Sequence, residues 1–288
     1  MQSIVVGTEE SDGAGTALRW AADEADRHGA NLTAVLAWGY LDQHRATPSD
    51  DFDTTYDEAD AREALDAIVE RALGAERAGG VQRRVVNDLA PQAMVDAAAG
   101  ADLLVVGARG LGQLRGVVLG SVSRYCLQHA PCPVAVIREA APDAGNHPRV
   151  VVGIDGSGSA LQALAWALDE GRVRQAKVEV VNAWHPPYLG AYPFDPGVID
   201  IGAFEQAARD LIEDALSKQD VTGLPVSPEA VIVEDGATAA ILSAADGADL
   251  VVVGSRGLGG FAEMLLGSVS HQVAHHAHCP VVVIRPEH

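Results

Sequence analysis

Basic residues are scarce in this sequence of 288 residues. Its 20 Lys and Arg stand against 40 Asp and Glu, so the formal charge is −20, and Lys177 and Lys218 are the only lysines. A surface this negative repels nucleic acid and anionic lipid, so we expect neither nucleic acid nor a membrane as a partner. A small anion is not excluded, because backbone N–H groups and a helix N-terminus can bind it locally.

Cysteines and long apolar runs are also few. Cys126, Cys132 and Cys279 cannot form an even set of disulfides, and we interpret them as packed thiols in a reducing compartment. The sequence shows no charged-then-apolar leader at Met1 and no apolar run of about 18 residues. These absences predict a cytoplasmic protein.

A duplicated block dominates what is present. Residues 101–138 recur at 248–285 with 23 identities in 38 ungapped positions. The equivalence of Trp20 and Trp166 extends the repeat to a period of about 146 residues, far longer than the unit of a solenoid. The period indicates two domains in tandem.

We predict these domains at residues 1–140 and 148–288. The join between them, residues 139–148, is rich in Ala, Pro, Asp, Gly and Asn and has no apolar periodicity.

Each domain alternates short apolar strands with helices, which predicts a doubly wound five-stranded parallel sheet with helices on both faces, an α/β fold of the Rossmann-like kind. The expected strands are residues 4–7, 32–38, 81–86, 103–106 and 134–137, then 150–154, 178–184, 231–233, 250–253 and 281–284. In this scheme the two last strands lie at sheet edges, and exposed edges invite pairing. We therefore expect an intrachain pseudo-dimer through these strands, and a homodimer.

In both copies of the block, a predicted strand is followed by Gly-x-x-Gly, then by nine residues, then by Gly-Ser-Val-Ser and a predicted helix. The residues are Gly107, Gly110, Gly120, Ser121, Val122 and Ser123 in the first copy, and Gly254, Gly257, Gly267, Ser268, Val269 and Ser270 in the second. Glycines between a strand and a helix let the backbone wrap a phosphate closely. No lysine follows either loop, so the P-loop mechanism is not indicated.

The acids that follow the first strands should face these loops. Ligands of doubly wound sheets bind beyond the carboxyl ends of the strands, where the winding reverses, and the first and fourth strands should be neighbours there. Glu9 and Asp155 end or follow the first strands. They would therefore converge on the loops, unless they act only as turn or cap residues.

The sequence resembles the tandem form of the universal stress protein family over nearly its whole length. The resemblance is carried by Val-Val-Gly-Ile-Asp-Gly-Ser at 151–157, by the second glycine block, and by the closing segment 273–285 with its His-His and Cys-Pro. It implies a fold like that of the adenine nucleotide alpha hydrolases, and ATP, with Mg²⁺, in the crevice of each domain.

The resemblance also implies residue roles. Gly153 and Asp155 would lie near the nucleoside, Ala183 or Trp184 near the adenine, and Arg256 with the second glycine block around the phosphates. Their counterparts in the first domain are Gly7, Glu9 and Arg109, with the first glycine block. Arg109 and Arg256 could also be ordinary surface residues, and Trp184 a core residue.

The first domain departs from the pattern because Glu9-Glu10 replaces Asp155-Gly156. The longer acid should disturb a tight contact, so we expect the second domain to bind better. His271 and His275 share a helical face, but the first domain keeps only His129 there, so no metal site is predicted.

We expect a nucleotide-dependent stress-response protein that signals to an unidentified regulatory protein. No triad or carboxylate pair repeats in both domains, so we expect at most weak ATP hydrolysis, and whether the protein is an enzyme stays open. The alternatives are a slow ATPase or phosphotransferase, and a nucleotide-free dimerisation scaffold.

Overall fold

The computed structural model describes residues 1–39, 56–110, 119–138, 148–185, 201–259 and 265–285. The chain divides into two compact units. Unit 1 comprises Met1–Ala141 and Ala274–His288, and unit 2 comprises Pro142–Val273. Most of the predicted join, residues 139–147, lies outside the described residues.

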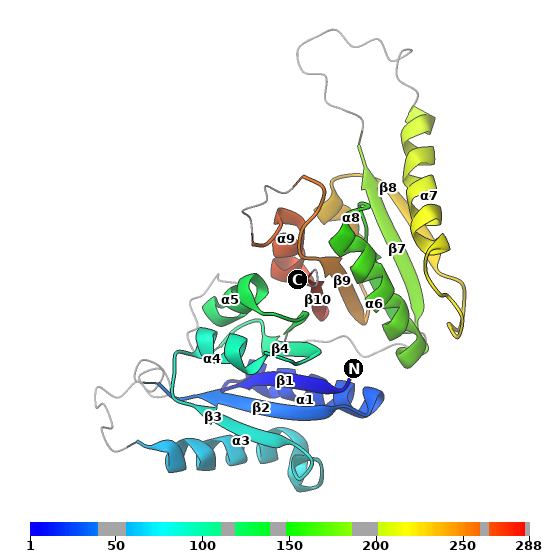
Figure 1. Cartoon of the computed structure of the whole chain (residues 1–288). Coiled ribbons are helices and arrows are strands. Elements are labelled where there is room, and N and C mark those ends of the chain that lie inside the picture. The colour runs from blue at the N-terminus through cyan, green and yellow to red at the C-terminus, as the bar shows by residue number, and fades with distance from the viewer. Residues whose placement is uncertain (40–55, 111–118, 139–147, 186–200, 260–264, 286–288) are drawn as a thin grey trace, which may run out of the picture. The chain divides into compact units, whose positions relative to one another are not determined.

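Unit 1 is a mainly parallel sheet covered by helices (Figure 1). Its strand order is β3-β2-β1-β4-β5-β10, and only β10 runs antiparallel to its neighbour β5. The elements are β1 (Ser3–Thr8), α1 (Asp12–His28), β2 (Asn31–Ala37), α3 (Glu58–Ala78), β3 (Gln82–Val86), α4 (Ala90–Ala97), β4 (Leu103–Gly107), α5 (Ser121–His129), β5 (Val134–Ile137) and β10 (Val281–Ile284). Helix α1 contacts α3, and α4 contacts α5.

Unit 2 repeats this plan with the parallel order β9-β6-β7-β8. Its elements are β6 (Arg149–Gly153), α6 (Gly158–Arg174), β7 (Lys177–Trp184), α7 (Ile201–Ser217), β8 (Glu229–Glu234), α8 (Ala237–Ala244) and β9 (Leu250–Gly254). Helix α9 (Ser268–His276) follows β9 along the chain. The predicted doubly wound α/β fold is confirmed.

The helices begin and end where their local chemistry dictates. Ser11 and Ser157 occupy the N-cap positions of α1 and α6, and their hydroxyls accept hydrogen bonds from the third following backbone N–H at 3.1 and 3.3 Å. Gly29 ends α1 with φ of 63°, a left-handed conformation that glycine adopts without strain. None of the described helices combines the length and the continuous apolar character that a bilayer span requires.

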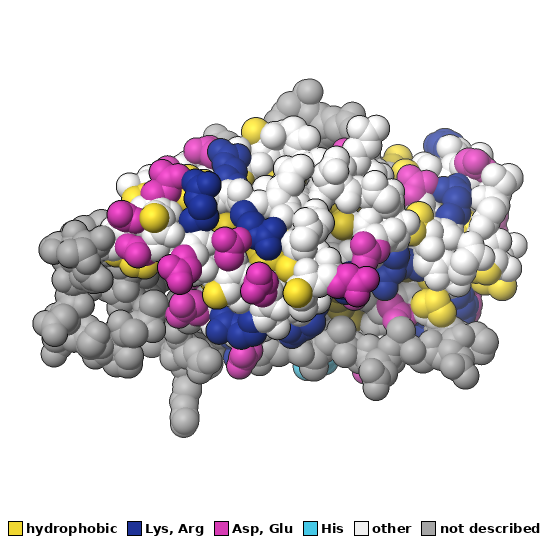
Figure 2. Space-filling view, turned by 90° about the horizontal axis from the view of Figure 1, so that it is seen from below, with side chains coloured by type: hydrophobic (Ala, Val, Ile, Leu, Met, Phe, Trp, Pro, Cys, Tyr) yellow, Lys and Arg dark blue, Asp and Glu magenta, His cyan; other side chains and the backbone are white. Residues whose placement is uncertain are grey.

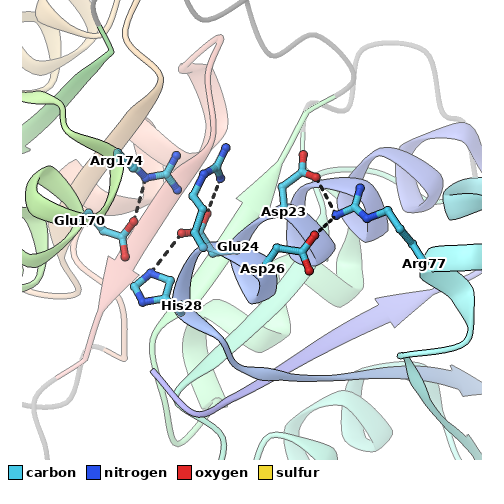
Figure 3. A network of polar contacts seen from close by, with 8 residues as sticks. Asp23, Glu24, Asp26, His28, Arg77, Glu170 and Arg174 are labelled. Carbon is cyan, nitrogen blue, oxygen red and sulfur yellow. Dashed lines mark hydrogen bonds and ion pairs between the residues drawn. The ribbon is translucent and has the colours of Figure 1, made fainter.

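Helix α1 buries an alanine-rich face and carries charged residues beside it. On its outer side, Asp23 and Asp26 accept hydrogen bonds from Arg77 of α3 at 2.9 and 2.7 Å (Figure 3). Glu24 is fully buried and pairs with His28 at 3.3 Å. The bonds of Arg77 join α3 to α1 on one side of unit 1.

The repeat-equivalent position in unit 2 is Glu170 of α6, which is also buried. It accepts a hydrogen bond from Arg174 at 2.8 Å (Figure 3). Both helices thus place a cationic or imidazole side chain four residues after a buried carboxylate.

The last strands of the two repeats pair as the sequence predicts. Val134, Ala135 and Val136 of β5 face Val283, Val282 and Val281 of β10 in antiparallel register. Ala135 therefore lies opposite its own repeat equivalent, Val282, so the pairing is self-complementary. The guanidinium of Arg138, after β5, donates to the carbonyls of Ala274 and His275 at 2.7 and 2.6 Å.

Acidic and basic side chains are interspersed over the described part of the face shown in Figure 2. Positive charge is not gathered into one continuous area on that face.

Candidate functional site

The glycine loops leave the sheets where the sequence predicts. We call residues 107–120 and 254–267 the first and second glycine loops; their segments 111–118 and 260–264 lie outside the described residues. The loops follow β4 and β9, which pair in parallel with β1 and β6. The predicted adjacency of first and fourth strands is confirmed, so each loop starts beside the turn that joins the first strand to the first helix.

In unit 2, Asp155 connects this turn to the second glycine loop. Its Oδ1 accepts a hydrogen bond from the N–H of Ser157 at 2.9 Å. Its Oδ2 accepts one from the N–H of Leu258, also at 2.9 Å, from a residue 103 positions away in the chain. Asp155 is therefore both a turn residue and a contact of the loop.

Two serines that the sequence analysis did not assign to the site strengthen this connection. The hydroxyl groups of Ser157 and Ser159 both donate to the backbone carbonyl of Arg256, the former at 3.2 Å. In a planar trans peptide the N–H points opposite to the C=O. The serines thus direct the N–H of Gly257 away from the start of α6. Ser157 is recognisable in sequence as an N-cap, whereas nothing in the sequence marks Ser159.

The close approach explains why two positions of the second loop are glycine. A Cβ atom at Gly254 would lie 2.7 Å from the Oγ of Ser159, well inside van der Waals contact. A Cβ atom at Gly257 would collide with Oδ2 of Asp155. The loop backbone can lie against the turn only because neither residue has a side chain.

Unit 1 builds the same region with different contacts. The Oε1 atom of Glu9 accepts a hydrogen bond from the hydroxyl of Ser11 at 2.7 Å. A Cβ atom at Gly110 would lie 2.7 Å from the same oxygen. Gly13 occupies the position of Ser159, so unit 1 has no second hydroxyl there. The backbone at Gly107 instead approaches the carbonyls of Gly13 and Arg109: a Cβ atom at Gly107 would lie 3.3 and 3.2 Å from them.

The second serine of each Gly-Ser-Val-Ser motif is turned inward. The buried Ser123 donates its hydroxyl to the carbonyls of Ala108 and Gly120 at 3.2 and 3.1 Å. The N–H of Gly120 also donates to Ala108, at 2.7 Å. These bonds close the first loop on itself, so the Ser123 hydroxyl serves the loop's own backbone.

The second loop is closed in the same way. Ser270 donates to the carbonyls of Ser255 and Gly267 at 3.0 and 3.1 Å, and the N–H of Gly267 donates to Ser255 at 2.7 Å. The repeat of this geometry shows that the third glycine and the second serine set the direction in which the following helix leaves the loop.

The N-terminus of α5 offers the groups that an anion needs. Its N-cap residue, Gly120, makes no side-chain capping bond. The following Ser121 is exposed and Val122 half-buried. Unsatisfied N–H groups and the helix dipole favour a negative charge at such a position. In the second copy Ser268 is likewise exposed and Val269 half-buried at the start of α9.

Arginine supplies positive charge near the loops. Arg109 is exposed and Arg256 half-buried. Burial lowers the pKa of the Arg138 guanidinium, and the nearby positive charge of Arg109 lowers it further. Two guanidinium groups thus lie near one another at the carboxyl end of β4 and β5.

The remaining predicted residues lie in or beside the sheets. Gly7 and Gly153 face a helix: a Cβ atom at Gly7 would lie 2.6 Å from Sδ of Met94, and one at Gly153 would collide with Ile241. Their immediate role is close helix–sheet packing. Ala183 is half-buried near the end of β7.

Aromatic side chains lie at the end of the second strand in both units. Trp184 stacks on Phe204, with ring centroids 6.0 Å apart and an interplanar angle of 5°. The ring centroids of Trp38 and Tyr56 lie 6.3 Å apart. The buried indole N–H of Trp38 has no hydrogen-bond partner among the described residues.

Fold and site together define a tandem α/β protein that carries a glycine loop after the fourth strand of each repeat. The sequence pattern of the universal stress protein family matches residues 1–138 and 147–285. The chain therefore belongs to the universal stress protein family, with two such domains in tandem.

Relatives and solved structures agree with this membership. A universal stress protein of Mycobacterium tuberculosis (strain H37Rv) is 34% identical over 292 residues, which cover 98% of this chain and 96% of the relative. One of Mycolicibacterium smegmatis is 32% identical over 309 residues, covering 98% and 97%. A universal stress protein structure from Archaeoglobus fulgidus has a TM-score of 0.64 at 18% identity and covers 98% of both chains, which supports the fold.

Proposed function

We propose that this universal stress protein binds ATP, with Mg²⁺, at the carboxyl ends of its sheets, and that the nucleotide regulates contact with a protein partner. The observation that carries the proposal is the second glycine loop. Its backbone is held against the first turn by Asp155, Ser157 and Ser159, and it leads into a helix N-terminus. A backbone that is already held in place at residues 256–258 needs less ordering on binding, which favours affinity for a phosphate chain.

The remaining predicted contacts extend this proposal. Gly257, whose N–H is oriented by the serine-bound peptide, together with Ser268 and Val269 at the start of α9, would contact the phosphates, with Arg256 beside them. Ala183 and Trp184, at the end of β7, would contact the base. In unit 1 the corresponding groups are Glu9, Arg109, Gly110, Ser121 and Val122. Because Glu9 bonds to Ser11 and Gly13 lacks a hydroxyl, we propose that unit 1 is the weaker site.

Nucleotide content and turnover test the proposal directly. Protein purified without added nucleotide would be denatured, and any nucleotide released into the supernatant would be identified by mass spectrometry. ATP binding would be measured separately by equilibrium dialysis with and without Mg²⁺. We expect bound adenine nucleotide and at most slow phosphate release. No binding by either method would refute the site, and rapid multiple turnover would refute a purely regulatory role.

A further inference from the structure

A groove of about 390 Å³ lies at the amino ends of the unit 1 strands, at the opposite end of the sheet from the first glycine loop. Ser3 of β1, Thr33 of β2, and Gln82 and Arg84 of β3 line it, with Ala97 at the end of α4 and Ala99, Gly100 and Ala101 after that helix. Its volume lies at the lower end of the range of about 300–1,000 Å³ that small-molecule sites occupy. A ligand of this groove would therefore be small.

Unit 2 has an arginine side chain in the corresponding place. Arg149 begins β6 as Ser3 begins β1, and the equivalence is fixed by one shared bond: Asp102 donates its N–H to the carbonyl of Ser3 at 2.9 Å, and Asp249 to that of Arg149 at 3.0 Å. The two positions are thus directly comparable.

The contacts of Arg149 show what this position of the fold can hold. Its guanidinium donates to the carbonyls of Ala244 and Asp246 at the end of α8, at 3.0 and 3.1 Å. It also donates to the carboxylate of Glu179 at 3.2 and 2.8 Å. A planar guanidinium with several N–H donors suits such a set of acceptors.

Unit 1 retains the helix-end carbonyls but lacks the arginine. Ala97 and Ala99, which line the groove, occupy the positions of Ala244 and Asp246, and the glycines that follow both have positive φ, 79° at Gly100 and 68° at Gly247. The last carbonyls of a helix have no intrahelical partner and carry its negative dipole end, so they favour a cation. The short side chain of Ser3 leaves this space to a ligand.

The groove is positive on another side. Arg84 is paired in register with Val35, and the equivalent pair in unit 2 is Val231 with Val181. An exposed guanidinium thus replaces an apolar side chain at the groove, and it would attract a carboxylate. The groove therefore offers acceptors for a cation in one part and a cationic donor in another.

We propose that this groove binds a small zwitterion with a guanidinium at one end and a carboxylate at the other, of which free L-arginine is the simplest probe. The guanidinium would bind the carbonyls of Ala97 and Ala99, as the Arg149 side chain binds their counterparts. The carboxylate would pair with Arg84. This inference does not depend on nucleotide binding at the other end of the sheet.

Titration of the ¹⁵N-labelled full chain with L-arginine and L-citrulline tests the proposal. Citrulline matches arginine in length but carries a neutral urea, so it forms no charge-assisted bond. We expect arginine to shift the amide signals of Ser3, Thr33 and Gly100, and citrulline to bind about tenfold more weakly. Equal affinities, or arginine shifts confined to other residues, would overturn the proposal.

Two substitutions taken from unit 2 give opposite expected effects. Ser3→Arg supplies the intrachain guanidinium and should abolish the arginine-induced shifts. Ala99→Asp adds the carboxylate that unit 2 has at this exposed position, and should tighten arginine binding severalfold. If Ser3→Arg fails to fold, the Ala99→Asp variant still tests the proposal. Arginine binding to that variant that is unchanged or weaker would contradict it.

Arg84 has its own test. Arg84→Ala should weaken L-arginine severalfold but leave agmatine, which lacks the carboxylate, unaffected. The matched control is Arg62→Ala, which removes an exposed arginine paired with Glu58 on α3 and should change neither. Equal effects of Arg84→Ala on arginine and agmatine would refute the assignment of the carboxylate.

Discussion

Asp155 accepts a hydrogen bond from the backbone N–H of Leu258 at 2.9 Å, although 103 positions separate them. The bond joins the first turn of unit 2 to its glycine loop. The carboxylate of Asp155 holds the loop backbone in place, but it also brings negative charge to the proposed phosphate site. Its net effect on nucleotide affinity is therefore a test of which role matters more.

We predict that Asp155→Asn weakens ATP binding to unit 2. Asparagine retains one acceptor oxygen but loses the charge that strengthens the bond to Leu258, and such charged bonds contribute about 1.5–3 kcal/mol when buried. Because the bond is exposed, we expect a smaller loss, of about fivefold in affinity, measured by titration calorimetry. Tighter binding would show that charge repulsion outweighs the support of the loop.

The second prediction concerns Gly257. In Gly257→Ala the new methyl group collides with Oδ2 of Asp155, so the loop must move away from the turn. We expect nucleotide binding to unit 2 to be lost while the circular dichroism spectrum is retained. Gly259→Ala is the matched control, because a Cβ atom there meets nothing within 4 Å. If the two variants bound nucleotide with equal affinity, the position of the loop would not matter for nucleotide binding, and the prediction would be wrong.

The sequence allowed the order of strands and helices to be predicted because apolar runs and glycine boundaries are local features. The adjacency of the first and fourth strands followed from the rules of doubly wound sheets. The bonds from Ser157 and Ser159 to Arg256 could not be predicted, since residues nearly 100 positions apart carry no pairwise pattern in one sequence. The groove beside Ser3 was missed for a similar reason: it depends on how far a neighbouring helix end lies from a short side chain.

The third prediction separates packing from binding at Gly153. A methyl group there collides with Ile241 of α8, so Gly153→Ala must displace the helix from the sheet. Overpacking of this kind typically costs about 1–3 kcal/mol. We expect unfolding at a lower urea midpoint, and tryptophan fluorescence would monitor the transition. Gly158→Ala, at the first position of α6, where a Cβ atom has no neighbour within 4 Å, is the control and should leave the midpoint nearly unchanged.

The last prediction concerns pH and Glu179, a buried residue of β7. Burial raises the pKa of its carboxyl group, but hydrogen bonds and charges from Arg149 and Lys177 outweigh burial and hold the pKa below its usual value. A carboxyl group whose pKa is lower in the folded chain contributes stability above its unfolded pKa. That contribution is lost as the pH falls through the folded pKa.

Glu179→Gln should therefore lower the free energy of unfolding at pH 7 by about 1.5–3 kcal/mol, the range for bonds to charged groups. The difference from the unsubstituted chain should shrink as the pH falls below the usual carboxyl range, because the native Glu179 then also becomes neutral. Urea unfolding at intervals from pH 7 to pH 3 measures this. Glu229→Gln is the control, since that carboxylate pairs with the same Lys177 but is 53% exposed. A difference between Glu179→Gln and the native chain that stays constant over this range would show that shape and packing, not charge, give Glu179 its effect.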